Sequence, residues 1–585
     1  DMLEMQRRLK EMPGLPNVET GRADAYFDRL HRTIAETDQY VHTWDGELYL
    51  EYHRGTYTSQ AAIKRWNRKL ELLCREAEWL SAMRAIGLGG SAEEKERGWR
   101  EYPQEALNEA WTIVLRNQFH DIIPGSSIRE VYEDSVLEYE AAEAIVAEAW
   151  REAANGLANP SPDEQGIALF NGSPWERSDL VRLEGLGDGR QFGLRDAAGN
   201  RLGMQTSPDG TVYVYAADLP AMGMASFDFV PARDPGDVCP FVVRTDGIAT
   251  PFYEISWNAK GQLTRIYDTT NSREVLKQGQ CGNVLQVFED KPKNFDAWDI
   301  DIFYHEKMLE VEELVGVTVK EKGELFASVE FVWTYMDSRI AQEMIVYAND
   351  RRIDFVTRVD WLERQRLLKV AFPVDVRATE ATYDIQYGNV KRPTHWNTSW
   401  DGARFETVGH QWADLSERGY GVSLLNDCKY GYDIKNHVMR LSLIKSAIWP
   451  DASADEGVHS FTYALYPHAG DWQDGGTVEA AWALNNPIRY TSGKGFAKRF
   501  SLFEVSASNV MVDAVKKAED GNRIVLRVHE YTGARGPVTI RSEARVRAWQ
   551  PCDLMEEATG EQTRDSLIAF EIKPYEIKTF LIDME

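Results

Sequence analysis

The strongest constraint on the fold of this 585-residue chain is a change of hydrophobic period near residue 155. Before that position, apolar residues recur every three or four positions, which is the spacing of one helix face. After it, short segments alternate apolar and polar residues between turn-forming residues, which is typical of half-buried strands. The Asn, Pro and Gly residues within 155–162 indicate a linker between the two halves. The sequence therefore predicts a helical region followed by β domains.

The helical region is predicted to contain three helices. The first begins after Ser59 and is expected to be amphipathic, because one face is apolar and the opposite face is basic: Ile63, Trp66, Leu70, Leu73, Ala77 and Leu80 against Lys64, Arg65, Arg68 and Arg75. The second is expected at 103–117 and the third at 128–150. We therefore predict a three-helix bundle over residues 55–152, followed by a linker at 153–165.

Residues 166–585 are predicted to form large antiparallel β-sandwich domains. Strand patterns recur with almost no helical pattern between them, as at 329–335, 353–361 and 524–529. We expect a large super-sandwich over 166–495 and a small C-terminal sandwich over 496–585, so the predicted fold class is multidomain α + β. Residues 1–54 lack a nucleating strand or helix cap of their own and are interpreted as the end of an upstream domain.

Composition excludes several classes of partner. The formal net charge of −27 repels phosphate backbones, so nucleic acid is not expected as a partner. No apolar run is long enough to span a bilayer, and no membrane partner is expected. The five cysteines are scattered singly, which argues against a disulfide framework or a cysteine zinc site and favours a reducing, cytoplasmic setting. A homo-oligomer is compatible with the sequence, which does not specify one.

His120 and Asp121 are the leading candidates for chemistry. They lie within residues 117–127 (NQFHDIIPGSS), between two predicted helices and before a Pro-Gly break. Adjacent side chains point in different directions, so one can ligate a metal while the other handles substrate or a proton. The alternative is structural: His120 bonds a free carbonyl at the helix end and Asp121 caps a nearby turn. A zinc site needs three or four ligands, and no H-x-D, H-E-x-x-H or C-x-x-C pattern supplies the others.

Further polar and aromatic groups gather at three places. Residues 52–57 (YHRGTY) form a turn before the first long helix, which fits either a pocket rim or an ordinary capped loop. Residues 289–301 and 392–401 interleave carboxylates and amides with tryptophan, as sugar hydroxyls and ring faces require; acidic surface turns with buried tryptophans are the alternative. Nucleotide-binding loops and the G-x-S-x-G pattern of serine hydrolases are absent from the sequence.

Several of these segments, in this order, resemble the α-mannosidases of glycoside hydrolase family 38, and most of all their bacterial and cytosolic-type branch. The matching segments are 46–58 (GELYLEYHRGTYT), 117–121 (NQFHD) with 124–127 (PGSS), 296–301 (DAWDID), 367–373 (LLKVAFP), 392–395 (RPTH) and 424–431 (LLNDCKYG). The similarity extends over essentially the whole chain.

The resemblance implies a zinc-dependent retaining α-mannosidase that acts on mannose-containing oligosaccharides. Family members combine an N-terminal seven-stranded α/β catalytic barrel, a three-helix bundle and C-terminal β domains. They hold one zinc ion with two histidines and two aspartates. The resemblance implies that His120 is the last zinc ligand and that Asp121 bonds mannose hydroxyls. It also implies that His53 and Arg54 lie near the sugar.

The resemblance also implies that the family's barrel is essentially missing here. The other zinc ligands, the nucleophile and the acid/base carboxylate belong to that barrel, so no catalytic residue is expected in this chain. The sequence is therefore interpreted as an N-terminally truncated enzyme that is inactive alone. Two alternatives remain: a non-catalytic carbohydrate-binding or scaffold module, and a different large glycosidase or glycan phosphorylase.

Overall fold

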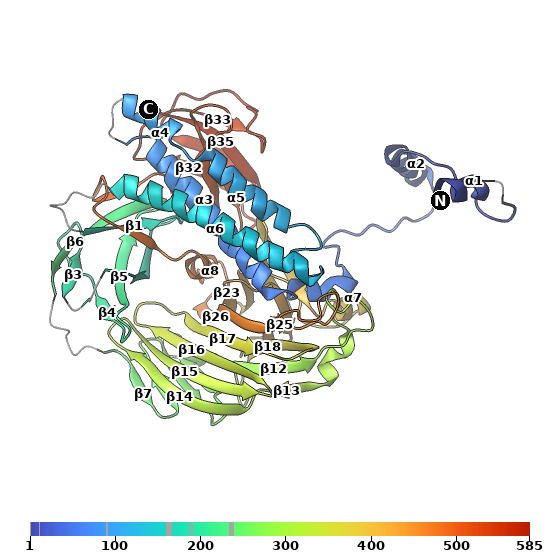
Figure 1. Ribbon diagram of the computed structural model, residues 1–585, viewed down its shortest axis with the longest axis horizontal. Helices are drawn as coiled ribbons and strands as arrows, with labels where there is room; N and C mark the ends of the chain where they lie inside the picture. Colours follow the sequence, from blue (N-terminus) through green and yellow to red (C-terminus); the bar gives the residue numbers. More distant parts are fainter. Residues whose placement is uncertain are drawn as a thin grey trace. The chain divides into compact units, whose positions relative to one another are not determined.

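The structure, a computed structural model, describes residues 2–10, 12–88, 92–158, 166–186, 189, 191–232 and 239–585. Its packing divides the chain into two compact units, residues 1–50 and 51–585, and each is described by itself. The helices and strands carry the labels of Figure 1.

The first unit contains the helices α1 (Met2–Leu9) and α2 (Ala23–Glu36). Neither helix has a buried residue, so neither contributes to a hydrophobic core. Local ion pairs stabilise α1 instead, since Arg7 and Arg8 both contact Glu4 at 2.9 Å. That residues 1–54 are the end of a barrel domain stays a prediction, and residues 51–54 belong to the second unit.

The helical part of the second unit follows the three predicted helices closely. A 3-10 turn, η1 (Glu51–Tyr57), leads to α3 (Ala61–Ala85), α5 (Gln104–Asn117) and α6 (Arg129–Ala158). These three long helices lie along one another (Figure 1). A short helix that the sequence pattern does not predict, α4 (Ala92–Arg100), stands between α3 and α5. No helix within the described ranges is long and apolar enough to cross a lipid bilayer.

Helix α3 differs from its amphipathic prediction. Lys64, Arg68 and Arg75 from the expected solvent face are buried, and only Arg65 of the four basic residues is exposed. These cations donate to main-chain carbonyls that come from other parts of the fold. Arg75, for example, bonds the carbonyls of Gly172 and Val512 at 3.0 and 2.7 Å. The expectation fails because periodicity separates charged from apolar residues but does not reveal that carbonyl acceptors cover the charged face.

The β region begins with a small sandwich that surrounds its own apolar core. One sheet has the order β27-β1-β6-β28, with β3 also paired to β6, and the other has the order β2-β5-β4. The strands are β1 (Gly166–Asn171), β2 (Arg177–Leu183), β3 (Phe192–Arg195), β4 (Met204–Thr206), β5 (Val212–Leu219), β6 (Gly223–Pro231), β27 (Arg489–Ser492) and β28 (Arg499–Ser501).

The large sandwich follows, with three sheets that share a second apolar core. Its longest sheet has the order β14-β15-β16-β17-β26-β23-β22-β19-β20, formed by β14 (Glu313–Lys322), β15 (Phe326–Tyr335), β16 (Ser338–Tyr347), β17 (Ile353–Trp361), β19 (Glu380–Ile385), β20 (Gly388–Pro393), β22 (Trp412–Glu417), β23 (Tyr420–Asn426) and β26 (Gly457–Ala469). The second has the order β13-β12-β18-β25-β24-β21, formed by β12 (Val284–Glu289), β13 (Met308–Glu310), β18 (Arg366–Pro373), β21 (Thr407–Val408), β24 (Gly431–Lys435) and β25 (Val438–Lys445).

The third sheet of this sandwich has the order β11-β10-β9-β8-β7. Its strands are β7 (Val242–Arg244), β8 (Gly247–Ala249), β9 (Tyr253–Trp257), β10 (Leu263–Asp268) and β11 (Arg273–Glu274). Short helices interrupt the connections of the large sandwich: η2 (Ile302–Glu306), α7 (Ser399–Ala403) and α8 (Thr477–Asn485).

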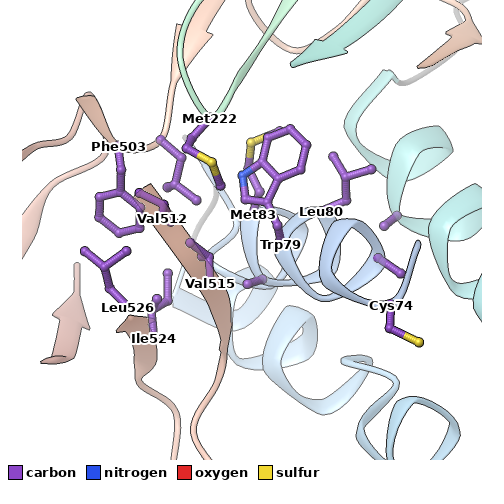
Figure 2. Packing of buried hydrophobic residues seen from close by; sticks show 14 of the residues in the cluster. Cys74, Trp79, Leu80, Met83, Met222, Phe503, Val512, Val515, Ile524 and Leu526 are labelled. Carbon is purple, nitrogen blue, oxygen red and sulfur yellow. The ribbon is translucent and has the colours of Figure 1, made fainter. Parts of the chain in front are cut away.

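The C-terminal sandwich has sheets of order β29-β32-β34 and β30-β31-β35-β33. Its strands are β29 (Glu504–Val505), β30 (Val510–Lys517), β31 (Ile524–Glu530), β32 (Gly536–Arg541), β33 (Val546–Cys552), β34 (Ile568–Ile572) and β35 (Ile577–Met584). Its core is continuous with that of the bundle. Figure 2 shows Trp79 and Met83 of α3 close to Met222 and to Val512 and Val515 of β30.

The predicted fold class, a three-helix bundle followed by antiparallel β-sandwiches, is confirmed, and every strand pair within the described residues is antiparallel. Some predicted limits of the linker and of the sandwiches differ from those in the structure. Helix α6 continues to Ala158, so residues 153–158 of the predicted linker are helical, while 159–165 lie outside the described residues. The two largest apolar cores within residues 166–495 are separate from each other, and β28 within the predicted terminal sandwich pairs with β6 of the first sandwich.

The shared core makes α3 sensitive to truncation of its buried side chains. Leu80→Ala is expected to lower the free energy of unfolding by about 2–5 kcal/mol, because Leu80 is 0% exposed and its removal leaves a cavity. Leu137→Ala on α6 is the matched control, since Leu137 is 66% exposed and the change is expected to stay within about 0.5 kcal/mol. Urea-unfolding midpoints measure both, and equal effects of the two substitutions would contradict this packing.

Candidate functional site

The segment that carries His120 and Asp121 connects two helices of the bundle. Helix α5 ends at Asn117 and α6 begins at Arg129, and residues 118–125 between them form consecutive turns. Asn117 is buried and donates to the Ile113 carbonyl and to Glu138 on α6. The helix end is therefore fixed, while the residues after it are placed at the surface.

His120 and Asp121 form an exposed polar pair. The His120 side chain is 77% exposed, and its Nε2 lies 3.3 Å from Oδ2 of Asp121, which is 43% exposed. Ser126 donates from Oγ to the other carboxylate oxygen of Asp121 at 3.0 Å. The Asp121 carboxylate accepts from this side chain and from no backbone amide among the described contacts, so the alternative in which Asp121 caps a turn stays a prediction. No hydrogen bond from His120 to a helix-end carbonyl appears among the described contacts, so that part of the alternative is not supported.

Contacts with α3 and with Ser59, two residues before the helix, hold this segment in place. Gln118 donates from Nε2 to Asn67 and Glu71 at 2.9 and 2.8 Å. The buried ammonium of Lys64 donates to the Ile123 carbonyl at 2.8 Å. Gly125 has a φ of +88°, and a side chain there would meet the Ser59 carbonyl oxygen at 2.3 Å, so only glycine allows this close approach. The backbone around His120 is therefore fixed although its side chain is exposed.

The turn that carries His53 and Arg54 packs against loops of the large sandwich. Arg54 is buried and donates to the Ala403 carbonyl at 2.8 Å, and its guanidinium lies 3.3 Å from Asp299. It also lies 4.4 Å from the ring centre of Phe405. Burial raises the pKa of Asp299, and Arg54 opposes that rise. These contacts fix the turn, and the sugar-binding role of Arg54 stays a prediction.

The side chain of His53 differs from that of Arg54 in its burial and its hydrogen bonding. Its side chain is half-buried, and its Nδ1 is buried without a hydrogen-bond partner among the described residues. No described hydrogen bond or ion pair connects His53 or Arg54 with His120 or Asp121. The two segments instead contact the same residues just before α3, because the Gly55 carbonyl accepts from the Thr58 and Ser59 amides while Gly125 packs on Ser59.

Two aspartates that sequence patterns do not single out hold the start of α3. Asp455 accepts from the amides of Gln60 and Ala61 at 2.7 and 2.8 Å. Its carboxylate satisfies free N–H groups at the positive end of the helix dipole. Asp451 accepts from the Gln60 side chain at 2.9 Å. Since these partners lie about 390 residues away in sequence, no local signal identifies them.

The first polar-aromatic segment, residues 289–301, lies against the His53 turn. The Gly55 amide donates to the Trp298 carbonyl at 2.7 Å, and Ser59 donates to the Ala297 carbonyl at 2.6 Å. Phe295 is exposed, and Trp298 stacks near the exposed Trp449 with ring centres 5.4 Å apart. In the second segment, 392–401, Trp396 lies beneath Lys435, and Asp401 forms a capping box with Thr398, the N-cap of α7. Both segments mix structural contacts with exposed aromatic surface.

The described residues do not include a complete metal site. Within the described ranges, no group of three or more His, Cys, Asp or Glu side chains is arranged to hold a metal ion. His120 and Asp121 are two adjacent donors, fewer than the three or four that zinc requires. These residues therefore do not form a complete zinc site by themselves, although an exposed imidazole is suited to act as one ligand.

Three family models match the chain. The Alpha mannosidase middle domain matches residues 51–157, which include η1 and the bundle. The Glycosyl hydrolases family 38 C-terminal domain matches residues 248–453, and the Glycosyl hydrolases family 38 C-terminal beta sandwich domain matches residues 509–580. The matches follow the order of the observed bundle, large sandwich and terminal sandwich.

Relatives match along the whole chain. It is 34% identical to Alpha-mannosidase 2C1 of Homo sapiens over 605 residues, covering 100% of this chain and 54% of that protein. It is 32% identical to Alpha-mannosidase G of Dictyostelium discoideum over 639 residues, covering 99% and 56% respectively. The chain therefore spans about half the length of these curated relatives.

A solved structure has the same fold. The crystal structure of an alpha-mannosidase from Enterococcus faecalis V583 matches with a TM-score of 0.80 and 17% identity, covering 100% of this chain and 74% of that chain. Because the identity is low, this likeness shows the fold alone.

Lys64, which holds the His120 segment, gives a testable pH dependence. Burial lowers the pKa of Lys64 to about 7, against about 10.4 in an unfolded chain. Between these values the unfolded state binds more protons, so this lysine makes stability rise with pH by about 1.4 kcal/mol per unit. Lys64→Met is expected to remove that rise.

Urea unfolding near pH 7.5 and pH 9 measures the effect. Lys69→Met on the same helix is the matched control, because Lys69 is exposed and pairs with Glu143 at the surface. The control is expected to keep the wild-type pH dependence. A Lys64→Met protein with an unchanged pH dependence would refute the charge-burial argument.

Proposed function

Because the chain belongs to glycoside hydrolase family 38, we propose that it is the C-terminal part of a zinc-dependent retaining α-mannosidase that removes terminal α-mannosides from glycans. The observation that carries the proposal is the exposed His120–Asp121 pair on a fixed backbone. Most polar side chains of this region form hydrogen bonds with other residues of the chain. The imidazole of His120, in contrast, has Asp121 as its one described polar partner. A metal or a substrate from outside the described residues can therefore reach it.

In this proposal each predicted site residue has a distinct role. His120 supplies one zinc ligand, and the remaining ligands and the nucleophile come from outside this chain. Asp121 accepts hydrogen bonds from mannose hydroxyls, since each carboxylate oxygen can accept more than one hydrogen bond and the described contacts are Ser126 on one oxygen and His120 on the other. His53 lies near the sugar, and its buried Nδ1 has no hydrogen-bond partner among the described residues. Arg54 keeps that turn in place through Ala403 and Asp299.

We also propose a cytoplasmic setting. All five cysteines are described, and all are free thiols. Burial raises the pKa of Cys74 and Cys428, which keeps these thiols protonated and unreactive. Structural thiols without a disulfide partner are typical of proteins that work in a reducing compartment.

The 585-residue chain alone is expected to be inactive. It should neither retain stoichiometric zinc in elemental analysis nor release nitrophenol from nitrophenyl α-mannoside, because three ligands and the nucleophile are absent from it. The same chain joined to a family 38 catalytic domain is the positive control. Appreciable turnover by the purified chain would contradict the proposal that the nucleophile and the other zinc ligands lie outside this chain.

His120 can be tested in that joined protein. His120→Ala is expected to lose zinc and activity together, because the substitution removes a metal ligand. His305→Ala is the matched control: His305 is also exposed, but it lies beside Trp396 on the large sandwich and is expected to leave both properties unchanged. Normal zinc content in the His120→Ala protein would refute the ligand assignment.

A further inference from the structure

A second candidate site lies where the bundle meets two β-sandwiches. Two adjoining cavities of 520 and 180 Å³ open there. Their walls come from α3, α5, α8, the β19–β20 hairpin and strands β30 and β31, and both share Glu71, Leu72, Tyr387, Trp482 and Asp513. The larger volume lies within the range of roughly 300–1,000 Å³ that small-molecule sites occupy. We call this feature the junction cleft.

The junction cleft carries charges of both signs in near balance. The larger cavity is lined by the cations Arg75, Lys516 and Arg527 and by the carboxylates Glu71, Glu78, Asp513 and Glu519. Neither sign dominates, and the whole chain is strongly acidic, so a phosphate-rich or nucleic acid ligand would be repelled. A neutral ligand with many hydroxyl groups can use donors and acceptors together.

The polar groups of the cleft are held by contacts among themselves. Asp513 accepts from His529 at 2.9 Å, and Glu78 accepts from the Trp111 indole at 3.0 Å. Lys516 pairs with Glu519 at 2.7 Å. Because these side chains already have fixed positions, binding does not have to order them, which reduces the entropic cost of forming new hydrogen bonds.

Aromatic surface stands at the rim and on the walls of the cleft. Tyr387 at the β19–β20 turn is 44% exposed and meets His529 edge-on, with ring centres 5.1 Å apart. Trp111 is half-buried on α5, and Trp482 lies under the guanidinium of Arg75 at 4.7 Å. An exposed aromatic face accepts the C–H groups on one face of a pyranose ring, while fixed polar groups bond the hydroxyls.

We infer that the junction cleft is a second carbohydrate site, which binds a neutral oligosaccharide of pyranose units with one ring against Tyr387 and hydroxyl groups on Asp513 and Arg527. The site is distinct from the His120–Asp121 pair, and none of the residues that line it is proposed to touch the zinc or the scissile sugar. Glu71 nevertheless connects the two places, because it lines the cleft and also accepts from Gln118, two residues before His120.

The identity of the sugar as mannose is inferred from the proposed function. Its class, a neutral pyranose, is inferred from the residues that line the cleft. The test therefore uses an α-linked mannotriose and maltotriose as probes, each added to the 585-residue chain. Saturation-transfer NMR detects binding, and titration gives the dissociation constants. Binding of either probe at the cleft supports the site, and tighter binding of mannotriose supports mannose.

Substitutions in the cleft locate the binding. Tyr387→Ala is expected to weaken it about tenfold by removing the aromatic face, whereas Tyr387→Phe keeps the ring and should leave it unchanged. Asp513→Asn is a second, nearly isosteric variant that should also weaken binding. Phe496→Ala is the external control, since this aromatic residue is 41% exposed, lies outside the cleft lining and belongs to none of the candidate sugar-binding segments, so its loss should have no effect.

Three results would overturn the inference: no binding of either trisaccharide, binding that survives both Tyr387→Ala and Asp513→Asn, or binding lost in Phe496→Ala but kept in the cleft variants. Thermal unfolding of each variant confirms that it is folded. A failure of the zinc and nitrophenol tests does not affect this result, because neither His120 nor a metal takes part in it.

Discussion

The buried cationic face of α3 is the interaction on which the rest of the structure depends. Lys64, Arg68 and Arg75 stand on one face of the helix and donate to carbonyls of the His120 segment, the large sandwich and the terminal sandwich respectively. Burying these charges is costly unless all their donors are satisfied. The burial lowers the pKa of Arg75 to about 10. The helix therefore adopts this position only when the surrounding loops present their carbonyls to it.

The arrangement explains why the bundle and the β domains form one unit rather than a string of modules. The apolar side of α3 extends the core of the terminal sandwich, through Trp79 and Met83 against Val512 and Val515. At its first turn, Asp455 from the large sandwich satisfies the helix amides. The His53 turn and the His120 segment are consequently built on the same rigid element. Sites on such elements are held more precisely than sites on free loops.

The same helix relates the candidate site to the junction cleft. Glu71 is one turn beyond Arg68 and contacts Gln118 on one side and the cleft on the other. The matches to family 38 models lie in the bundle and the sandwiches, and the sequence similarity to the relatives extends along this chain. The cleft comes instead from the way these parts meet, so it is a property of their assembly.

The sequence by itself determined the helices, the antiparallel β regions, the family resemblance and the position of His120 and Asp121. Periodicity, turn residues and local motifs act over a few residues, and a single sequence displays them directly. Only the tertiary structure decided that the basic face of α3 is buried, that residues 166–495 divide between two large cores, and that Asp299, Asp451 and Asp455 hold the candidate site. Those partners lie hundreds of residues apart along the chain, and no local pattern encodes which distant carbonyl or carboxylate will cover a given charge.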